Sequence, residues 1–369
     1  MRARIALFVA IIQAILFLGH WFVYETLCSF VPTSAPGATN ALRLALAILS
    51  VSFVAASLLS FRYNNFFVRA FYSAAAVWIG FLNFFFLAAV GCWIAFPLAQ
   101  LLRLGISRAE IAETLFGLAA LAALYGIVNA SWTRVERITV KLPGLPDSWR
   151  GRVAALVTDT HLGHVRGRLF MSRIVALIRR LHPDVVFIAG DLFDGTKADL
   201  ARLAGPWKNI SPRFGTYFVT GNHEEFSDSR KYLEAVELAG IRVLHNEKVE
   251  VDGLQIVGTM NGASGSASLY RSALENVRLD PSRATVLLTH VPHALSIAEA
   301  EGVSLQLSGH THVGQMIPFT WFTWRIFGPF TYGLRRFGKM QVYTSSGAGT
   351  WGPPMRVGTK PEIALITFQ

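Results

Sequence analysis

The chain has 369 residues, of which 52% are hydrophobic and only 15% are Asp, Glu, Lys or Arg. This composition excludes a disordered chain and argues against a single soluble domain, in which about 25% of residues are charged. The deficit of charged residues is local, because residues 1–130 hold only 7 of the 34 Lys and Arg and 3 of the 23 Asp and Glu. The net charge of +11 does not indicate nucleic-acid binding, since much of the excess flanks apolar stretches.

Four apolar stretches without Asp, Glu, Lys or Arg come first: Ile5–Tyr24, Leu44–Phe61, Ala70–Leu102 and Thr114–Thr133. Each approaches or exceeds the roughly 20 residues that cross a bilayer, so we predict four membrane-spanning helices. The third is longer than one straight crossing, and we expect its end near Gly91 and Pro97 to bend into the interface. A cleaved signal peptide, with Ser34 and Ala35 near the cleavage site, is the alternative for the first stretch. It is disfavoured because the apolar core exceeds about 15 residues and further spans follow.

Basic residues predict the orientation of these helices. One side of the membrane would receive Arg2, Arg4, Arg62, Arg69, Arg134, Arg137 and Lys141, and the other side only Arg43, Arg103 and Arg108. By the positive-inside rule, both termini and the C-terminal domain face the cytoplasm, in a multi-pass protein of the cell inner membrane. Cys28 and Cys92 both lie in the membrane region, and a cysteine-free domain fits a reducing compartment without proving it.

Beyond Arg137, short β-type runs alternate with helical patterns, which predicts an α/β domain over residues 151–369 after a linker at 134–150. The expected strands are 153–158, 185–189, 217–220, 249–257 with a turn at Asp252-Gly253, 285–289, 305–307, 341–343 and 363–368. The expected helices are 168–181, 229–238, 268–277 and 294–300.

Polar clusters follow five of these strands: Asp159-Thr160-His161, Gly190-Asp191-Leu192-Phe193-Asp194, Gly221-Asn222-His223-Glu224, Thr289-His290 and Gly309-His310-Thr311-His312. In open α/β sheets, ligands bind just beyond the carboxyl ends of the strands, so we expect these side chains to converge. Carboxylate, amide and imidazole donors without a thiolate suit Zn, Fe or Mn. A buried structural polar residue is the alternative for each position, but the whole succession favours a metal site.

In their order, these clusters resemble the calcineurin-like metallophosphoesterase superfamily, whose pattern is D-x-H, G-D-x-x-D, G-N-H-D/E, a lone His and G-H-x-H. The apolar N-terminal region, the form G-H-T-H-x-G-Q at Gly309–Gln315 and the ending Pro361-Glu362-Ile363 resemble its YkuE-like branch with transmembrane helices. The resemblance implies a four-layer α/β/β/α sandwich and two metal ions about 3–4 Å apart. It assigns Asp159, His161 and His312 to one metal, Asn222, His290 and His310 to the other, and Asp191 to both.

Two metal ions that share a water lower its pKa and clamp the phosphoryl oxygens, and a bridging carboxylate such as Asp191 must offer both oxygens. The resemblance makes His223 the general acid for the leaving oxygen, with Asp194 orienting it in its cationic form. The alternatives are a supporting role for His223 and a turn or helix-cap carboxylate for Asp194. His164, three residues after His161, is expected at the surface, and contact with substrate is the alternative. At Ser346, YkuE-like members often carry Arg, so a phosphate contact of that residue is not implied here.

The segment 317–339 interleaves eight aromatic residues with Arg325, Arg335, Arg336 and Lys339. It is either a buried aromatic cluster or an interfacial loop, in which aromatic rings lie at headgroup depth and basic residues attract anionic lipid.

We therefore expect a membrane-anchored dinuclear metallophosphoesterase that hydrolyses phosphoester, phosphodiester or pyrophosphate bonds. The anchor and the aromatic segment suit a lipid-linked phosphate substrate and contact with membrane lipids. The alternatives are a UDP-2,3-diacylglucosamine-type lipid pyrophosphatase and a non-catalytic membrane sensor or scaffold. The residues do not select the metal or the oligomeric state.

Overall fold

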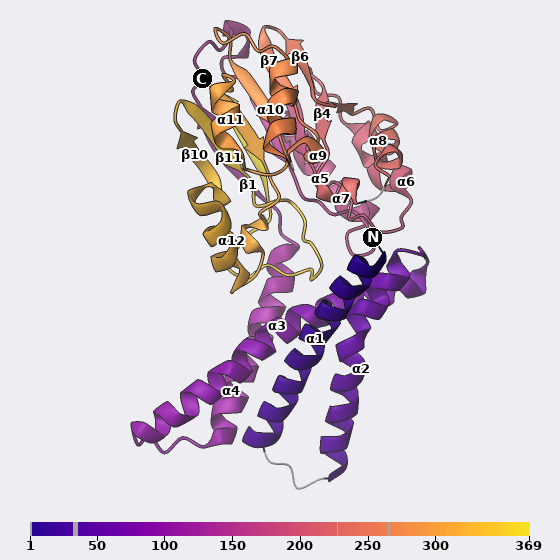
Figure 1. Ribbon diagram of the computed structural model, residues 1–369, viewed down its shortest axis with the longest axis vertical. Coiled ribbons are helices and arrows are strands. Elements are labelled where there is room, and N and C mark those ends of the chain that lie inside the picture. Colours follow the sequence, from indigo (N-terminus) through magenta and orange to yellow (C-terminus); the bar gives the residue numbers. More distant parts are fainter. Residues whose placement is uncertain (1, 32–35, 227, 265) are drawn as a thin grey trace. The chain divides into compact units, whose positions relative to one another are not determined.

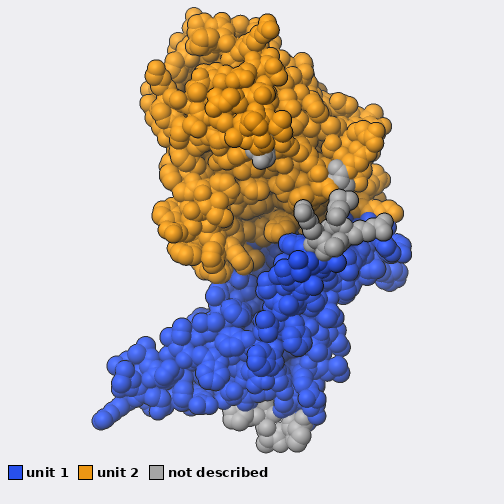
Figure 2. All heavy atoms as spheres, in the orientation of Figure 1, with its two compact units in different colours: residues 1–128, 352–355 blue, residues 129–351, 356–369 orange. Residues whose placement is uncertain are grey.

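The computed structural model describes residues 2–31, 36–226, 228–264 and 266–369. The chain forms two compact units, one of residues 1–128 with 352–355 and one of residues 129–351 with 356–369 (Figure 2). Ser34 and Ala35, at the disfavoured cleavage site, lie outside the described residues, as do the side chains of Arg2 and Arg4.

The first unit contains four long apolar helices, α1 (Arg2–Phe30), α2 (Pro36–Ser60), α3 (Phe66–Leu101) and α4 (Arg108–Ala130), labelled in Figure 1. All four are long and apolar enough to cross a membrane, as predicted. In the most apolar 18-residue stretch of each helix, between 11% and 33% of the residues are buried within the protein. Most of this apolar surface therefore needs lipid around it. At about 1.5 Å per residue, the 36 residues of α3 reach well beyond a bilayer core, and the helix runs on through Gly91 and Pro97.

Polar side chains inside this helical unit bond to one another. Trp78 Nε1 donates to His20 Nε2 at 2.8 Å, and His20 Nδ1 donates to the Leu16 carbonyl at 2.7 Å. Trp93 Nε1 donates to Thr26 Oγ1 at 2.9 Å. Such bonds between helices satisfy groups that lipid cannot.

The second unit is built on two six-stranded mixed sheets. The first has the order β1 (Arg134–Val140), β12 (Glu362–Phe368), β2 (Val153–Val157), β3 (Val185–Ala189), β4 (Thr216–Val219) and β5 (Arg242–Val243). The second has the order β10 (Gly333–Phe337), β11 (Met340–Thr344), β9 (Leu305–Ser308), β8 (Thr285–Leu288), β7 (Leu254–Gly258) and β6 (Glu247–Val251). Residues 134–140, expected in the linker, form β1, which pairs in parallel with β12.

Helices cover the outer faces of both sheets (Figure 1). The helices of this unit are α5 (Arg168–Leu181), α6 (Leu200–Ala204), α7 (Asn222–Glu225), α8 (Arg230–Glu237), α9 (Asn261–Ser264), α10 (Ala267–Asn276), α11 (Leu295–Ala300) and α12 (Phe319–Phe327). The α5 bounds match the expected helix, whereas α6, α12 and the strands β1, β5 and β10 were not predicted.

The inner strands β3, β4, β7, β8, β9 and β11 are buried on both of their faces. In β3, Phe187 lies in the cluster between the two sheets with Val286 of β8, while Ile188 packs on the other side with Ile178 of α5. This two-sided burial explains the uninterrupted apolar run of β3, because successive side chains point to opposite faces. A third cluster joins β7 and β8 to α10 and α11. The predicted four-layer α/β/β/α sandwich is therefore confirmed.

Candidate metal centre

The predicted ligands lie in loops that follow the strands of both sheets. Asp159 and His161 follow β2, Asp191 follows β3, Asn222 follows β4, His290 follows β8, and His310 and His312 follow β9. Their donor atoms form close groups, and within each group the atoms lie within 4.8 Å of one another. The groups are Asp159 with His161 and His312, Asp191 with His290 and His310, and His161 with Asp194 and His223.

The first group combines one carboxylate with two imidazoles. His312 Nε2 lies 3.4 Å from Asp159 Oδ1 and 2.9 Å from His161 Nε2. All three side chains are buried. Two imidazole nitrogens that face one another beside a carboxylate offer lone pairs to a common point, which is how a cation is bound.

The second group contains the amide ligand. Asn222 Oδ1 lies 3.2 Å from His290 Nε2 and 3.0 Å from His310 Nδ1. Asp191 Oδ2 lies 3.1 Å from His290 Nε2 and 3.8 Å from His161 Nε2 of the first group. Asp191 therefore stands between the two groups.

The hydrogen bond of His290 fits a bound metal ion. The Nδ1 atom of His290 donates to the Ala189 carbonyl at 2.9 Å, whereas Nδ1 of His161 makes no hydrogen bond and lies 3.6 Å from Asp194 Oδ1. A partner of this kind on one ring nitrogen sets the tautomer that leaves the other, Nε2, free to bind a metal. Oxygen and imidazole donors without thiolate suit Mn, Fe or Zn.

The backbone at these residues is held in an unusual conformation. Positive φ angles occur at Asp159 (53°), His161 (48°), Asp191 (52°), His310 (69°) and His312 (46°). Left-handed backbone costs a non-glycine residue about 1–3 kcal/mol, and it concentrates at functional sites.

Two neighbouring glycines are required by close contacts. A Cβ atom at Gly221 would collide with the Asp191 carboxylate, and one at Gly309 would collide with the Asp159 carboxylate. Packing of the surrounding fold therefore supplies the free energy that offsets the strained backbone and holds the ligand side chains in position.

The charges of the cluster are strongly coupled. Burial alone would lower the pKa of His290, but the Asp191 carboxylate outweighs burial and raises that pKa to about 10. Burial and the nearby His290 lower the pKa of His310 to about 3. Burial opposes the charge of Asp191, yet His290 and His161 hold its pKa well below the usual range. At neutral pH Asp191 is thus ionised and His310 neutral, which are the forms that bind a metal, whereas His290 is protonated and must release its proton when a metal binds.

The contact between His223 and Asp194 differs from the expected one. His223 Nδ1 donates to the main-chain carbonyl of Asp194 at 3.0 Å, while the Asp194 carboxylate lies 3.9 Å from the same nitrogen. Burial and the adjacent His161 lower the pKa of His223. The carbonyl still fixes the ring orientation, and the carboxylate lies slightly nearer to His161, at 3.6 Å.

Glu224 and Arg356 organise the site from behind the ligands. The Glu224 carboxylate accepts from the main-chain N–H groups of Asp191 (3.0 Å), Phe193 (2.9 Å) and Gly221 (2.8 Å). Its signal in the sequence is its place three residues after Gly221, as in a capping box. Arg356 is fully buried, and its guanidinium donates to the carbonyls of His312 (3.2 Å), Ser346 (2.6 Å) and Gly349 (2.8 Å). No local pattern marks Arg356, because it joins its own loop, through Ser346 and Gly349, to His312 in the loop after β9.

The prediction for His164 is wrong. This residue is buried, with 3% of its surface exposed, and its Nδ1 lies 3.1 Å from Thr196 Oγ1. The loop that follows β2 folds inward over residues 162–166, where Gly163 N–H donates to the Arg166 carbonyl at 2.8 Å.

Residues 153–314 match the family model described as Calcineurin-like phosphoesterase. The chain is similar to a transmembrane protein with metallophosphoesterase domain of Danio rerio, at 34% identity over 68% of this chain and 61% of that protein. It is also similar to an uncharacterized metallophosphoesterase of Campylobacter jejuni, at 30% identity over 64% and 63% of the two chains. More distantly, it is 24% identical to the uncharacterized metallophosphoesterase YkuE of Bacillus subtilis, over 72% and 98%. The chain thus spans about three fifths of the first two relatives.

Proposed function

Because this chain belongs to the calcineurin-like metallophosphoesterase family, we propose that it hydrolyses phosphate esters or anhydrides as a membrane-anchored enzyme with two metal ions. The observation that carries this proposal is the pair of largely buried donor groups that meet at Asp191. A single structural metal would need one such group, whereas two adjacent groups that share a carboxylate suit two-metal hydrolysis.

The ligand assignment follows the two groups. Asp159, His161 and His312 would hold one ion, and Asn222, His290 and His310 the other, with Asp191 between them. When bound, the two ions would lower the pKa of a water molecule and neutralise charge on the phosphoryl oxygens.

His223 is the proposed general acid. Its Nδ1 donates to the Asp194 carbonyl at 3.0 Å, which leaves Nε2 as the nitrogen that can act on a substrate. In the reaction, a water oxygen bonds to phosphorus and the bond from phosphorus to the leaving oxygen breaks. The leaving oxygen takes a proton from Nε2 of His223 in its imidazolium form, a proton of the attacking water passes to solvent, and His223 then regains a proton from solvent.

The substrate class is proposed from the membrane anchor. Four helices long enough to span a bilayer would bring the catalytic unit to its surface, where a lipid-linked phosphate is available. A UDP-2,3-diacylglucosamine-type pyrophosphate is one specific candidate. A non-catalytic sensor or scaffold is disfavoured, because it would not need the complete set of proposed ligands together with His223.

The cytoplasmic inner-membrane location also remains a proposal. It is supported by Arg62 and Arg69 between α2 and α3 and by Arg134 and Arg137 after α4, on the side that carries the catalytic unit.

The test is metal analysis and hydrolysis by the purified full chain in detergent. We expect two transition-metal ions per chain, and hydrolysis of a chromogenic phosphodiester that stops on chelation and returns with Mn²⁺. Asp191→Asn should lower the occupancy of both sites, because its Oδ2 lies near ligands of each. Asp228→Asn, at an exposed carboxylate paired with Arg230, is the matched control and should change neither. One ion per chain, or full activity without metal, would refute the proposal.

A further inference from the structure

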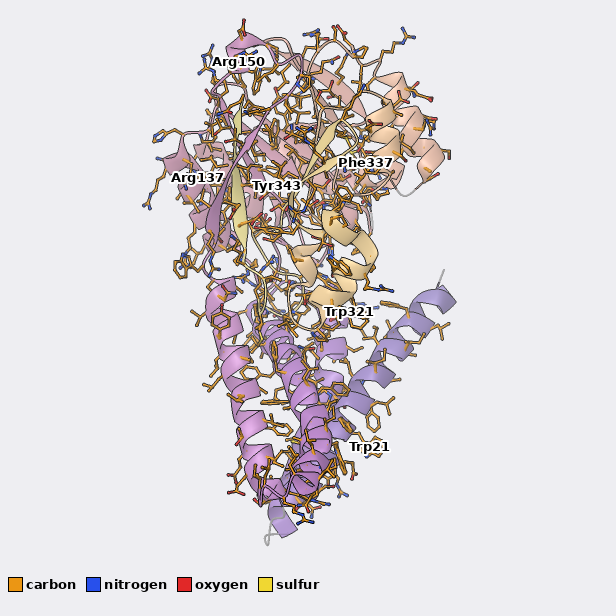
Figure 3. All side chains as sticks on the ribbon, turned by 90° about the vertical axis from the view of Figure 1, so that its left-hand side faces the viewer. Trp21, Arg137, Arg150, Trp321, Phe337 and Tyr343 are labelled. Carbon is orange, nitrogen blue, oxygen red and sulfur yellow. The ribbon has the colours of Figure 1, made fainter. Side chains whose placement is uncertain are left out.

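The helix α12 presents its apolar side chains to the surroundings. None of its nine residues, all of them described, is buried. The exposed fractions are 48% for Phe319, 58% for Trp321, 50% for Phe322, 55% for Trp324 and 74% for Ile326 (Figure 3 labels Trp321). A short helix in water is normally stabilised by packing of an apolar face, so this surface calls for a partner.

The rest of the aromatic segment behaves differently. Phe330 and Phe337 are half-buried against the cluster of β7, β8, α10 and α11, with their rings 6.0 Å apart. The segment therefore divides into a part that packs on the core and an exposed part. We call the exposed residues Phe319, Trp321, Phe322, Trp324, Arg325 and Ile326 the α12 surface.

The charge around the α12 surface is positive. The Arg325 guanidinium lies 6.0 Å from the centre of the Trp321 ring, and Arg335, Arg336 and Lys339 are exposed in the following hairpin. Residues 317–339 contain no Asp or Glu. Exposed tryptophan and phenylalanine with adjacent arginine match the headgroup region of a bilayer that contains anionic lipid. A second copy of the same cationic surface would be repelled.

The α12 surface adjoins the metal centre. The Phe327 ring, at the end of α12, lies 6.0 Å from the ring of the proposed ligand His310. At the other end, the helix packs on the turn His312–Gly314, where a Cβ atom at Gly314 would collide with the Phe319 carbonyl.

We propose that the α12 surface docks on a bilayer containing anionic lipid and holds the metal centre at that bilayer. Residues 131–133 alone separate α4 from β1, so the domain stays tethered to the membrane that the helices cross. The aromatic side chains enter the headgroup region, and Arg325 contacts lipid phosphates. Docking would give the metal centre access to phosphate esters at the bilayer surface. This consequence for catalysis rests on the function proposed above, but docking itself does not.

The experiment measures contact between α12 and lipid in the full chain. Cys28→Ser and Cys92→Ala remove the native thiols, and Ile326→Cys then carries an environment-sensitive fluorophore. The matched control is Leu238→Cys, an apolar residue that is 60% exposed and directly follows α8, a helix distant from α12 in Figure 1. The protein is placed in nanodiscs of phosphatidylcholine with or without 30% phosphatidylglycerol, and a fraction of the lipid carries a headgroup-region quencher.

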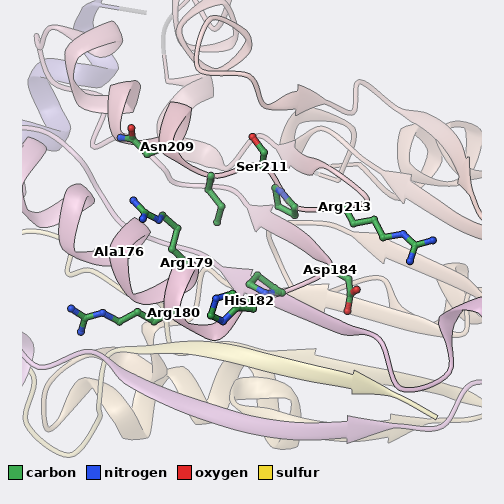
Figure 4. Close-up of a pocket in the computed structure, with 11 residues that line it drawn as sticks. Ala176, Arg179, Arg180, His182, Asp184, Asn209, Ser211 and Arg213 are labelled. Carbon is green, nitrogen blue, oxygen red and sulfur yellow. The ribbon is translucent and has the colours of Figure 1, made fainter.

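We expect strong quenching at position 326 with phosphatidylglycerol, weaker quenching without it, and no lipid-dependent quenching at position 238. Replacing Arg325, Arg335 and Arg336 with Gln should lower the docking equilibrium on the order of 100-fold, from about 1 kcal/mol per basic residue at an anionic surface. The charge-matched control replaces Arg179, Arg180 and Arg213, which line an open groove of about 730 Å³ (Figure 4). This groove lies at the amino end of β3, away from the metal centre, and the control should dock normally.

The outcomes separate docking from catalysis. A fluorophore at position 326 that lipid quenchers do not reach would overturn docking, even if the enzyme hydrolyses phosphate esters. A blue shift at position 326 that disappears on dilution into empty nanodiscs would assign the α12 surface to a second copy and would also overturn it. Quenching without any hydrolysis would support docking and refute the proposed enzyme.

Discussion

Arg356 offers a direct test of what holds the metal-centre loops together. Its side chain is fully buried, and it donates to main-chain carbonyls of three different loop residues, His312, Ser346 and Gly349, at 2.6–3.2 Å. It also lies 3.1 Å from Nδ1 of His312. Replacing Arg356 with Met keeps much of the volume and removes every donor.

The expected cost follows from the three carbonyls. A buried acceptor left without a partner costs about 1–3 kcal/mol, so the three together give about 3–9 kcal/mol, and partial relaxation favours the lower half of this range. For a domain of this size, about 4 kcal/mol lowers the melting temperature by roughly 10 °C. Arg356→Lys keeps the charge and can reach fewer carbonyls, so about half of this loss is expected.

The assay is thermal unfolding of the purified full chain in detergent, followed by near-ultraviolet circular dichroism, with metal content measured in parallel. Arg230→Met, at an exposed arginine, is the matched control and should leave the melting temperature unchanged. If Arg356→Met melted within 1 °C of the parent protein and kept its metals, the guanidinium would not be holding these loops.

Three further predictions concern the acid, a glycine and the topology. His223→Ala should lower kcat about 10²- to 10⁴-fold with both metals retained, and the loss should be smaller for p-nitrophenyl than for alkyl esters; equal losses would argue against proton donation. Gly309→Ala should reduce metal content and activity, because its Cβ would collide with the Asp159 carboxylate, whereas Gly205→Ala, where a Cβ meets open space, should behave like the parent. Alkaline phosphatase fused after Gln369 should be inactive, since both termini are expected in the cytoplasm; a strongly active fusion would reverse the proposed orientation.

Local patterns in the chain were sufficient for the buried inner strands of the sandwich and for the membrane-spanning candidates. Buried strands such as β3 need apolar residues on both faces, and long apolar helices need about 20 residues without charge, so both leave a local signal. The motif residues also lay near the ends of their strands, which is why their convergence could be predicted before the fold was known. The resemblance to calcineurin-like metallophosphoesterases is confirmed by the match over residues 153–314.

Other features depend on residues far apart in the chain. Strand β1 carries the charged residues Arg134, Glu136 and Arg137, and it becomes part of a sheet only because its backbone pairs in register with β12, from Arg134 opposite Glu362 onward. The conformation of His223 is set by the carbonyl of Asp194, and spacing alone does not distinguish a carbonyl from the carboxylate of the same residue.

The sequence by itself determined the identity of the candidate ligands and the presence of an apolar anchor, because each depends on residue types that lie close together in the chain. Tertiary structure alone decided which aromatic residues of segment 317–339 are covered and which remain exposed on α12. It also decided that Arg356 joins three loop residues behind His312. The physical reason is that burial and hydrogen bonding between distant segments depend on how the whole chain packs, and no local pattern carries that information.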